Sequence, residues 1–160
     1  MMKTTEAASG GYDCIRLENQ LCFPLYACAK EIVRQYRIPL TRLNLTYTQY
    51  VVMMVLWEKE HLSERELGKM VMLDSGTLAP LLKRLEKQGL ITRMRAQGDE
   101  RRLVISLTEK GRTLREKAME VPDAVRGCIN LSEAEQAQLK TLLNKALSNM
   151  NADYGMPQAD

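Results

Sequence analysis

The sequence has no long run of apolar residues. Hydrophobic residues make up 45% of the 160 residues, but no stretch approaches the roughly 20 consecutive apolar residues that a membrane-spanning helix needs. Residues 1–13 contain no apolar stretch of the kind found in a signal peptide. We therefore expect a cytoplasmic protein that does not associate with a membrane.

Signatures of a metal site are missing as well. His61 is the only histidine, and no two of the four cysteines are spaced as CxxC, so neither zinc nor another cofactor is expected. Cytoplasmic thiols are kept reduced. Cys14, Cys22, Cys28 and Cys128 are therefore not expected to form a structural disulfide framework.

The net charge of +3 is unevenly distributed. Residues 83–102 contain seven basic and three acidic side chains, which leaves −1 for the rest of the chain. Such a basic block on a nearly neutral body is typical of a nucleic-acid-binding face, although a solvated charged surface is the alternative on charge alone. The chain is long enough for one domain, residues 1–160, with its own hydrophobic core.

Local signals predict helices over the first part of the chain. Apolar residues at helical spacing predict a helix over about 14–37, and Pro39 is expected to end it because the residue before a proline avoids the helical region. Thr46 or Thr48 can cap a second helix. The residues before this region, 1–13, are polar and are expected to form a loose tail.

Two short helices are predicted next. Ser63 followed by Glu66 is a capping box, which predicts a helix that starts there. Asp74 caps the following helix, Pro80 is expected near its first turn, and Gly89 is expected to stop it.

After Gly89 the hydrophobic period changes from helical to alternating. Residues 90–95 and 102–107 are predicted to form two strands joined by a hairpin. Another helix is expected from Thr108 toward Gly127, with a break at Pro122. Ser132 opens a second capping box and starts a final helix, and residues 151–160 are expected to fray.

This order of elements predicts the fold class: mainly α with a small β-hairpin, with a winged helix-turn-helix over about 47–107. In that fold the second short helix lies in the DNA major groove and the hairpin carries cations to a neighbouring groove. Hydroxyl groups and cations in these elements are candidates to contact phosphates and base edges. The candidate DNA-binding residues are Ser75, Thr77, Lys83, Arg84, Arg93, Arg95, Arg101 and Arg102.

The two ends of the chain are predicted to form a dimerisation region. The helices within 14–45 and 109–150 are apolar on one face, and a module of about 60 residues cannot cover all of that surface. A second copy is the simplest partner, and a two-fold homodimer matches a pseudo-palindromic operator in double-stranded DNA.

Several segments resemble the MarR family and, within it, the OhrR branch of organic-hydroperoxide-sensing repressors. The resemblance extends from about Glu18 to Lys117. The segments that carry it are LENQLCF (17–23), LTYTQY (45–50), LDSGTL (73–78), PLLKRLE (80–86) and DER (99–101). The family's DNA-reading helix falls on residues 74–88, and the acidic and basic residues of its wing fall on Asp99 and Arg101. The resemblance therefore adds Asp99 to the candidate DNA-binding residues.

The resemblance implies a dimeric winged-helix repressor, and not an enzyme, whose redox sensor is Cys22. It implies that Tyr36 and Tyr47 of the partner subunit hydrogen-bond the sensing thiol and that Tyr26 also lines the site. In the two-cysteine subgroup a distant second cysteine resolves the oxidised sensor across the dimer, and Cys128 is suitably placed. One-cysteine members pair with small thiols instead.

A sensing cysteine must react as the thiolate. Phenol hydroxyl groups can donate hydrogen bonds to the sulfur and favour that form, whereas an apolar surround of Leu21, Phe23 and Leu25 would favour organic peroxides but disfavour the charge. Attack on a peroxide gives a sulfenic acid, which condenses with a second thiol. If the two cysteines of the reduced protein lie farther apart than the roughly 7 Å between Cα atoms that a disulfide allows, the helices must move to form the bond. Release of DNA would follow from that movement.

Pro24 departs from the family pattern. It either kinks the first helix or starts a fresh helical segment, and in the second case Cys22 approaches a helix N-terminus that favours its thiolate. Cys14 and Cys28 are expected to be buried and inert.

Three alternatives to a peroxide-sensing repressor remain open. The first is a MarR-type regulator of virulence or general redox genes that senses another oxidant or electrophile. The second is a repressor that binds a phenolic or drug-like ligand. The third, a thiol peroxidase, is disfavoured because no Thr/Arg cluster that would polarise a peroxide surrounds Cys22.

Overall fold

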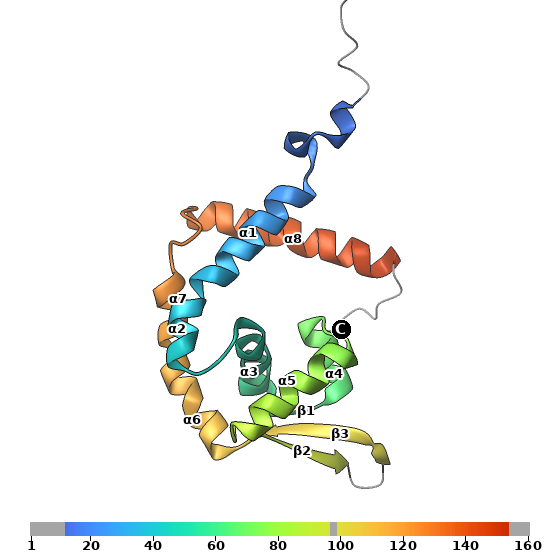
Figure 1. The fold of residues 1–160 in the computed structure, drawn as a ribbon, viewed down its shortest axis with the longest axis vertical. Coiled ribbons are helices and arrows are strands. Elements are labelled where there is room, and N and C mark those ends of the chain that lie inside the picture. The colour runs from blue at the N-terminus through green and yellow to red at the C-terminus, as the bar shows by residue number, and fades with distance from the viewer. Residues whose placement is uncertain (1–11, 97–98, 154–160) are drawn as a thin grey trace, which may run out of the picture. The chain divides into compact units, whose positions relative to one another are not determined.

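The computed structural model describes residues 12–96 and 99–153, without the side chains at 96, 99–102 and 151–153. The chain divides into two compact units, and the boundary lies between Gln35 and Tyr36. Figure 1 labels the helices and strands of both units. No helix in the described ranges combines the length and apolar character needed to cross a membrane.

The first unit contains one α-helix, α1 (Cys22–Gln35), preceded by two 3-10 turns at Asp13–Ile15 and Leu17–Asn19. The prediction of one continuous helix from residue 14 is therefore wrong. Pro24 is the third residue of α1, where a missing N–H costs nothing because the first-turn N–H groups have no acceptor within the helix. Of the two outcomes considered for Pro24, the structure has the one in which a fresh helix starts beside it.

The second unit begins with α2 (Arg37–Arg42) and α3 (Tyr47–Lys59). Pro39 was expected to end a helix, but it lies in the first turn of α2, a position that proline tolerates. Thr46 caps α3 through a complete capping box with Gln49, so Thr46 and not Thr48 is the cap.

Helices α4 (Glu64–Val71) and α5 (Ser75–Lys87) form the helix-turn-helix. Ser63 caps α4 through the predicted capping box, and Asp74 caps α5. Gly89, at φ +73°, ends α5 as predicted: its N–H donates to Glu86 O at 2.8 Å. Pro80 was expected near the first turn of this helix, but it lies in the second turn, inside α5.

The sheet has three antiparallel strands in the order β1–β3–β2. The predicted hairpin is formed by β2 (Ile91–Ala96) and β3 (Asp99–Leu107). A further strand, β1 (His61–Ser63), pairs with β3. The sequence did not predict it, because three residues are too few to show an alternating pattern and the pairing depends on a strand far along the chain.

Three helices follow the sheet: α6 (Glu109–Ala118), α7 (Glu120–Val125) and α8 (Glu133–Asp153). The predicted break falls between α6 and α7, and Pro122 lies in the first turn of α7. Ser132 and Glu135 form the predicted capping box before α8. All side chains from Glu133 to Met150 are exposed within the single chain.

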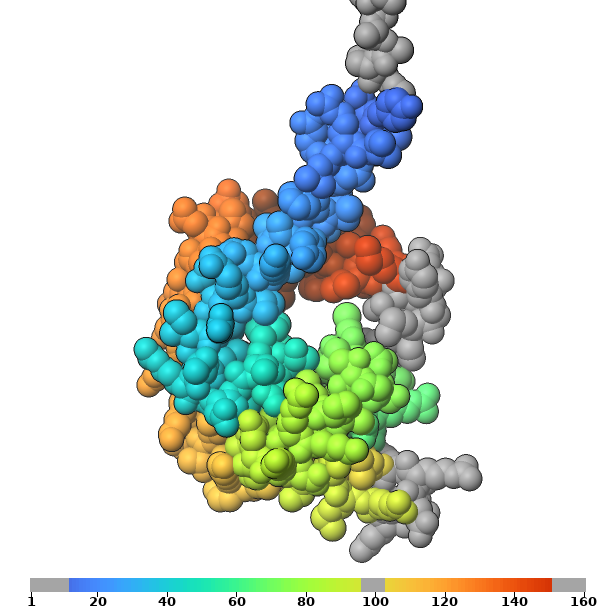
Figure 2. All heavy atoms as spheres, viewed as in Figure 1, coloured from blue at the N-terminus to red at the C-terminus, as the bar shows by residue number. Residues whose placement is uncertain are grey.

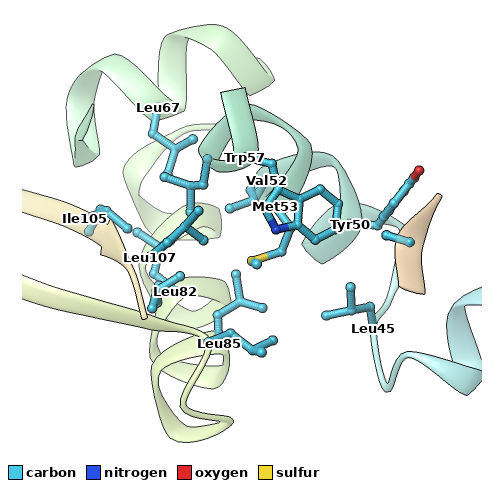
Figure 3. Close-up of a cluster of buried hydrophobic side chains, with 14 of the residues drawn as sticks. Leu45, Tyr50, Val52, Met53, Trp57, Leu67, Leu82, Leu85, Ile105 and Leu107 are labelled. Atoms are coloured by element: carbon cyan, nitrogen blue, oxygen red, sulfur yellow. The ribbon is translucent and has the colours of Figure 1, made fainter. Parts of the chain in front are cut away.

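The core of the second unit collects apolar side chains from α2, α3, α4, α5 and the hairpin (Figure 3). Met53 and Leu56 of α3 and Leu82 and Leu85 of α5 are fully buried. Trp57 adds a polar link, because its indole N–H donates to Gly111 O at 2.8 Å. This core holds α5 and the hairpin together as one module.

Candidate DNA-binding face and redox site

The exposed face of α5 carries most of the predicted DNA-binding residues. Ser75, Thr77, Lys83 and Arg84 are all exposed, while Leu78, Leu82 and Leu85 on the opposite face are buried. Figure 2 shows this segment, in yellow-green, at the surface that faces the viewer. The helix therefore presents hydroxyl groups and cations to solvent on a rigid apolar base.

Lys87 also belongs to this exposed face, although it is not among the residues predicted from the sequence to bind DNA. It follows Lys83 by one helical turn and is exposed. The signal was present in the sequence, because residues four apart on a helix share a face.

Asp74 fixes the start of α5. Its carboxylate accepts hydrogen bonds from the Thr77 hydroxyl (2.8 Å) and from the Thr77 backbone N–H (2.9 Å). These two bonds, the hydroxyl first, lower the pKa of Asp74 below its ordinary value of 3.8. The Thr77 hydroxyl proton is thus directed to the cap, and its oxygen remains to accept a hydrogen bond.

The predicted wing residues differ in their surroundings. Arg95 on β2 is exposed. Arg93 donates from Nε to Glu86 Oε2 at 2.9 Å, and its side chain is only 18% exposed. The side chains of Asp99, Arg101 and Arg102 lie outside the described part of the chain, so their roles stay predictions.

All four cysteines are free and exposed within the single chain. The expectation that Cys14 and Cys28 are buried is therefore wrong for the isolated chain. Cys22 is the first residue of α1. Its predicted apolar surround is also open to solvent in one chain, with Leu21 76% and Phe23 44% exposed.

Tyr26 lies one turn after Cys22 on α1 and is exposed. The Lys30 ammonium lies 5.9 Å from the centroid of its ring. The predicted thiol-activating residue of the first unit therefore forms a weak cation–π contact on an open helix face.

Tyr36 and Tyr47, the other two predicted thiol-activating residues, lie together in the second unit. Their rings are edge to face with centroids 5.0 Å apart. Tyr50 joins them, 6.1 Å from Tyr36, and Trp57 lies 6.1 Å from Tyr50. Tyr50 was not predicted from the sequence to belong to this cluster, and its spacing of three residues from Tyr47 was the available signal.

The electrostatics of this tyrosine cluster include Cys128. The pKa of Tyr36 is raised, first by burial, then by the neighbouring Tyr47 and then by Cys128. Burial also raises the pKa of Tyr50, with smaller effects from Tyr36 and Tyr47. Cys128 therefore lies within electrostatic range of Tyr36, although the two residues are remote in sequence.

No group of three or more His, Cys, Asp or Glu side chains in the described ranges is arranged to hold a metal ion.

Comparison with known proteins identifies relatives that match most of this chain. A family model described as "Transcriptional regulator SarA/Rot" matches residues 34–118. The organic hydroperoxide resistance transcriptional regulator of Bacillus subtilis (strain 168) is 47% identical over 140 residues, which cover 88% of this chain and 95% of that protein. The regulator SarZ of Staphylococcus haemolyticus is 43% identical over 138 residues, covering 86% of this chain and 93% of that protein.

Among solved structures, AbfR of Staphylococcus epidermidis is similar over most of its length. Reduced AbfR bound to DNA matches with a TM-score of 0.72 and 35% identity, covering 85% of this chain and 95% of that one. Overoxidized AbfR bound to DNA matches with a TM-score of 0.70 at the same identity, covering 85% and 96%. The winged-helix arrangement seen here is thus shared with regulators solved on DNA.

Proposed function

Since the chain belongs to the MarR-like winged-helix family of DNA-binding transcriptional regulators, with the SarA/Rot and OhrR-like proteins, we propose that it is a transcriptional repressor. We further propose that it senses organic hydroperoxides through Cys22. Oxidation of Cys22 releases the protein from its operator. The proposal concerns the signal and its chemistry, which family membership does not specify.

The observation that carries the proposal is the edge-to-face pair of Tyr36 and Tyr47 in the second unit, together with the electrostatic effect of Cys128 on the pKa of Tyr36. A sensing thiol from a second subunit needs hydrogen-bond donors while it is reduced and a thiol partner once it is oxidised. Two adjacent phenols, with a cysteine that acts electrostatically on one of them, offer both. This arrangement supports Cys128, rather than a small thiol, as the resolving residue.

The position of Cys22 supports its role as the nucleophile. It is exposed and lies at the first residue of α1, where unpaired N–H groups favour a negative charge. The thiolate sulfur attacks the peroxide oxygen distal to the organic group, the O–O bond breaks, and the leaving alkoxide takes a proton to form an alcohol. The sulfur becomes a sulfenic acid and the peroxide is reduced by two electrons.

The second step forms the disulfide. The Cys128 thiolate attacks the sulfenic sulfur of Cys22 in the partner subunit, a sulfur–sulfur bond forms, and the hydroxyl leaves as water after taking a proton. The bond requires Cα atoms within about 7 Å of each other. If the Cα atoms of Cys22 and Cys128 lie farther apart in the reduced dimer, the helices must move to form the disulfide. Those helices set the distance between the two DNA-reading modules.

Homodimerisation is supported by the apolar surface that each single chain leaves open. Leu142 and Met150 of α8 are 64% and 56% exposed, and α1 has no buried residue. Surfaces of this kind are usually covered by a partner. Light scattering is expected to give a mass of about 36 kDa, twice that of the 18.2 kDa chain.

On DNA, α5 is the recognition helix in the major groove. Ser75, Thr77, Lys83 and Arg84 contact base edges or phosphates from it, and Arg95, Arg101 and Arg102 contact phosphates from the wing. Asp99 belongs to the same DNA-binding wing. Lys87 joins the phosphate contacts, since it shares the exposed face of α5.

The test uses a labelled duplex that the reduced wild-type protein selects from a pool of random sequences. One equivalent of cumene hydroperoxide per Cys22 is expected to abolish binding, and dithiothreitol to restore it. Cys22→Ser is expected to bind the duplex and ignore the hydroperoxide, whereas Cys14→Ser, the matched control, responds as wild type does. If Cys22→Ser still dissociates on treatment, Cys22 is not the sensor.

The resolving step has a separate readout. After oxidation, wild type is expected to migrate as a covalent dimer on a non-reducing gel, and Cys128→Ser as a monomer. A covalent dimer that persists in Cys128→Ser but disappears in Cys28→Ser would move the resolving role to Cys28. Release of DNA by hydroxylated aromatic acids, with all four cysteines replaced, would instead favour a ligand-binding regulator.

A further inference from the structure

One ion pair joins the recognition helix to the wing. Arg93 on β2 donates from Nε to Glu86 Oε2 of α5 at 2.9 Å. The Arg93 side chain is 18% exposed and that of Glu86 39%. Most other ion pairs in the described part of the chain lie between residues close in sequence on open surfaces, so this one differs in burial and in the elements that it connects.

The strand pattern explains why Arg93 is turned inward. Successive side chains of a strand point to opposite faces. Ile91 is buried and Met94 is 69% exposed, so Arg93 shares the face of Ile91. Its partner across the hairpin is Ile105, which is completely buried. Arg93 therefore lies on the core face of the hairpin, among the apolar side chains of Ile91, Ile105 and Leu103.

Glu86 neutralises this inward cation from the last turn of α5. A largely buried guanidinium that loses its carboxylate pays a larger penalty than an exposed one, because water cannot fully replace the partner. The pair also spans the turn at Gly89, where the chain leaves α5 and enters β2. It is thus a direct side-chain link between the two elements that must reach DNA together.

We propose that the Glu86–Arg93 ion pair positions the wing against the recognition helix, and that Arg93 is a positioning residue rather than a phosphate contact. Arg95, farther along the same strand, is then already held in position before the protein binds DNA. Preorganisation of this kind raises affinity because less conformational freedom is lost on binding. The proposal rests on DNA binding alone and does not depend on the redox chemistry of Cys22.

The test is a charge exchange. Arg93→Glu and Glu86→Arg each break the pair, and the double variant Glu86→Arg/Arg93→Glu restores it with wild-type net charge. Binding of the selected duplex is measured for reduced protein at fixed salt, with each protein's folded fraction checked by circular dichroism. Each single variant is expected to bind roughly tenfold or more weakly, and the double variant to recover to within about threefold of wild type.

The exposed pair Glu109–Arg112 on α6 provides the matched control. Glu109→Arg and Arg112→Glu change net charge by the same amounts, so they calibrate the general electrostatic effect on DNA affinity. The effects at positions 86 and 93 are expected to exceed these controls.

Two results of the charge exchange would overturn the proposal. If Glu86→Arg binds DNA as tightly as Glu109→Arg does, and the double variant binds as weakly as Arg93→Glu, then Arg93 acts as a phosphate contact. If the single variants unfold more easily but the folded protein binds with wild-type affinity, the pair only stabilises the fold. Should a charge reversal fail to fold, Glu86→Gln, Arg93→Gln and their double variant give the same cycle, and additive effects on affinity would refute the coupling.

Discussion

Gly111 is the position where a single added carbon is expected to be most damaging. It is the third residue of α6, and a Cβ built on it would lie 2.0 Å from Leu90 O and 3.2 Å from Leu107 Cδ2. The Leu90 carbonyl cannot easily retreat, because it accepts a hydrogen bond from the Thr108 N–H at 3.1 Å. The Gly111 carbonyl in turn accepts the indole N–H of Trp57.

The expected cost of Gly111→Ala follows from these contacts. Forcing the carbonyl and the added methyl apart costs about 1–3 kcal/mol as overpacking. Displacing the Gly111 carbonyl from the buried indole costs about another 1–3 kcal/mol. Alanine returns about 1 kcal/mol through its better helix propensity. We therefore expect a net loss of about 3 kcal/mol in the free energy of unfolding.

Urea unfolding at fixed protein concentration measures this loss, with fluorescence of Trp57, the only tryptophan, and circular dichroism as two probes. Gly127→Ala is the matched control: nothing lies within 4 Å of its added carbon, and its φ of +84° predicts a loss of about 1 kcal/mol for backbone strain alone. A Gly111→Ala protein no less stable than this control would refute the argument from close approach.

Three further predictions test the caps and the DNA face. Met72→Gly is expected to raise the free energy of unfolding by about 0.5–1 kcal/mol, because Met72 has φ +54° at the end of α4; a loss of stability in urea would contradict this. Because the Thr77 hydroxyl lowers the pKa of Asp74, the cap stabilises the fold above pH 3.8 and this contribution disappears as the pH falls through the lowered pKa. The difference between the urea unfolding midpoints of wild type and Asp74→Asn, measured as the pH is lowered from neutral to below 3.8, should shrink as the cap is protonated. A difference that does not change with pH would show that the charge of Asp74 is irrelevant. Lys83→Gln is expected to lower the slope of log affinity against log salt by about 0.9, whereas Lys140→Gln on α8 leaves it unchanged, and equal slopes for both would exclude a phosphate contact at Lys83.

The local signals of the sequence were sufficient for most of the fold. The caps at Thr46, Ser63 and Asp74 are closed by partners three residues away, so the sequence contains both halves of each interaction. Gly89 ends α5 because the backbone there is left-handed, a conformation that glycine adopts without strain. That signal is contained in one residue. Prolines were harder to interpret: Pro39 and Pro80 both lie inside helices, since the effect of a proline depends on where the helix begins.

The candidate sites divide in the same way. The exposed cations of α5 follow from helical spacing, which is visible in the sequence. The pairing of Arg93 with Glu86 does not, because the alternation of β2 gives two faces without saying which one packs against α5. The approach of Cys128 to Tyr36 also depends on how α2 and α7 pack.

By itself, the sequence determined the order of most elements, the starts of the helices capped by Ser63, Asp74 and Ser132, and the family, because these depend on short patterns whose members are neighbours in the chain. Only the tertiary structure decided that His61–Ser63 adds a third strand, that Gly111 touches Leu90 and that one wing cation faces inward. Each of these contacts joins residues from different elements, and the packing of a shared core selects which of many compatible surfaces meet.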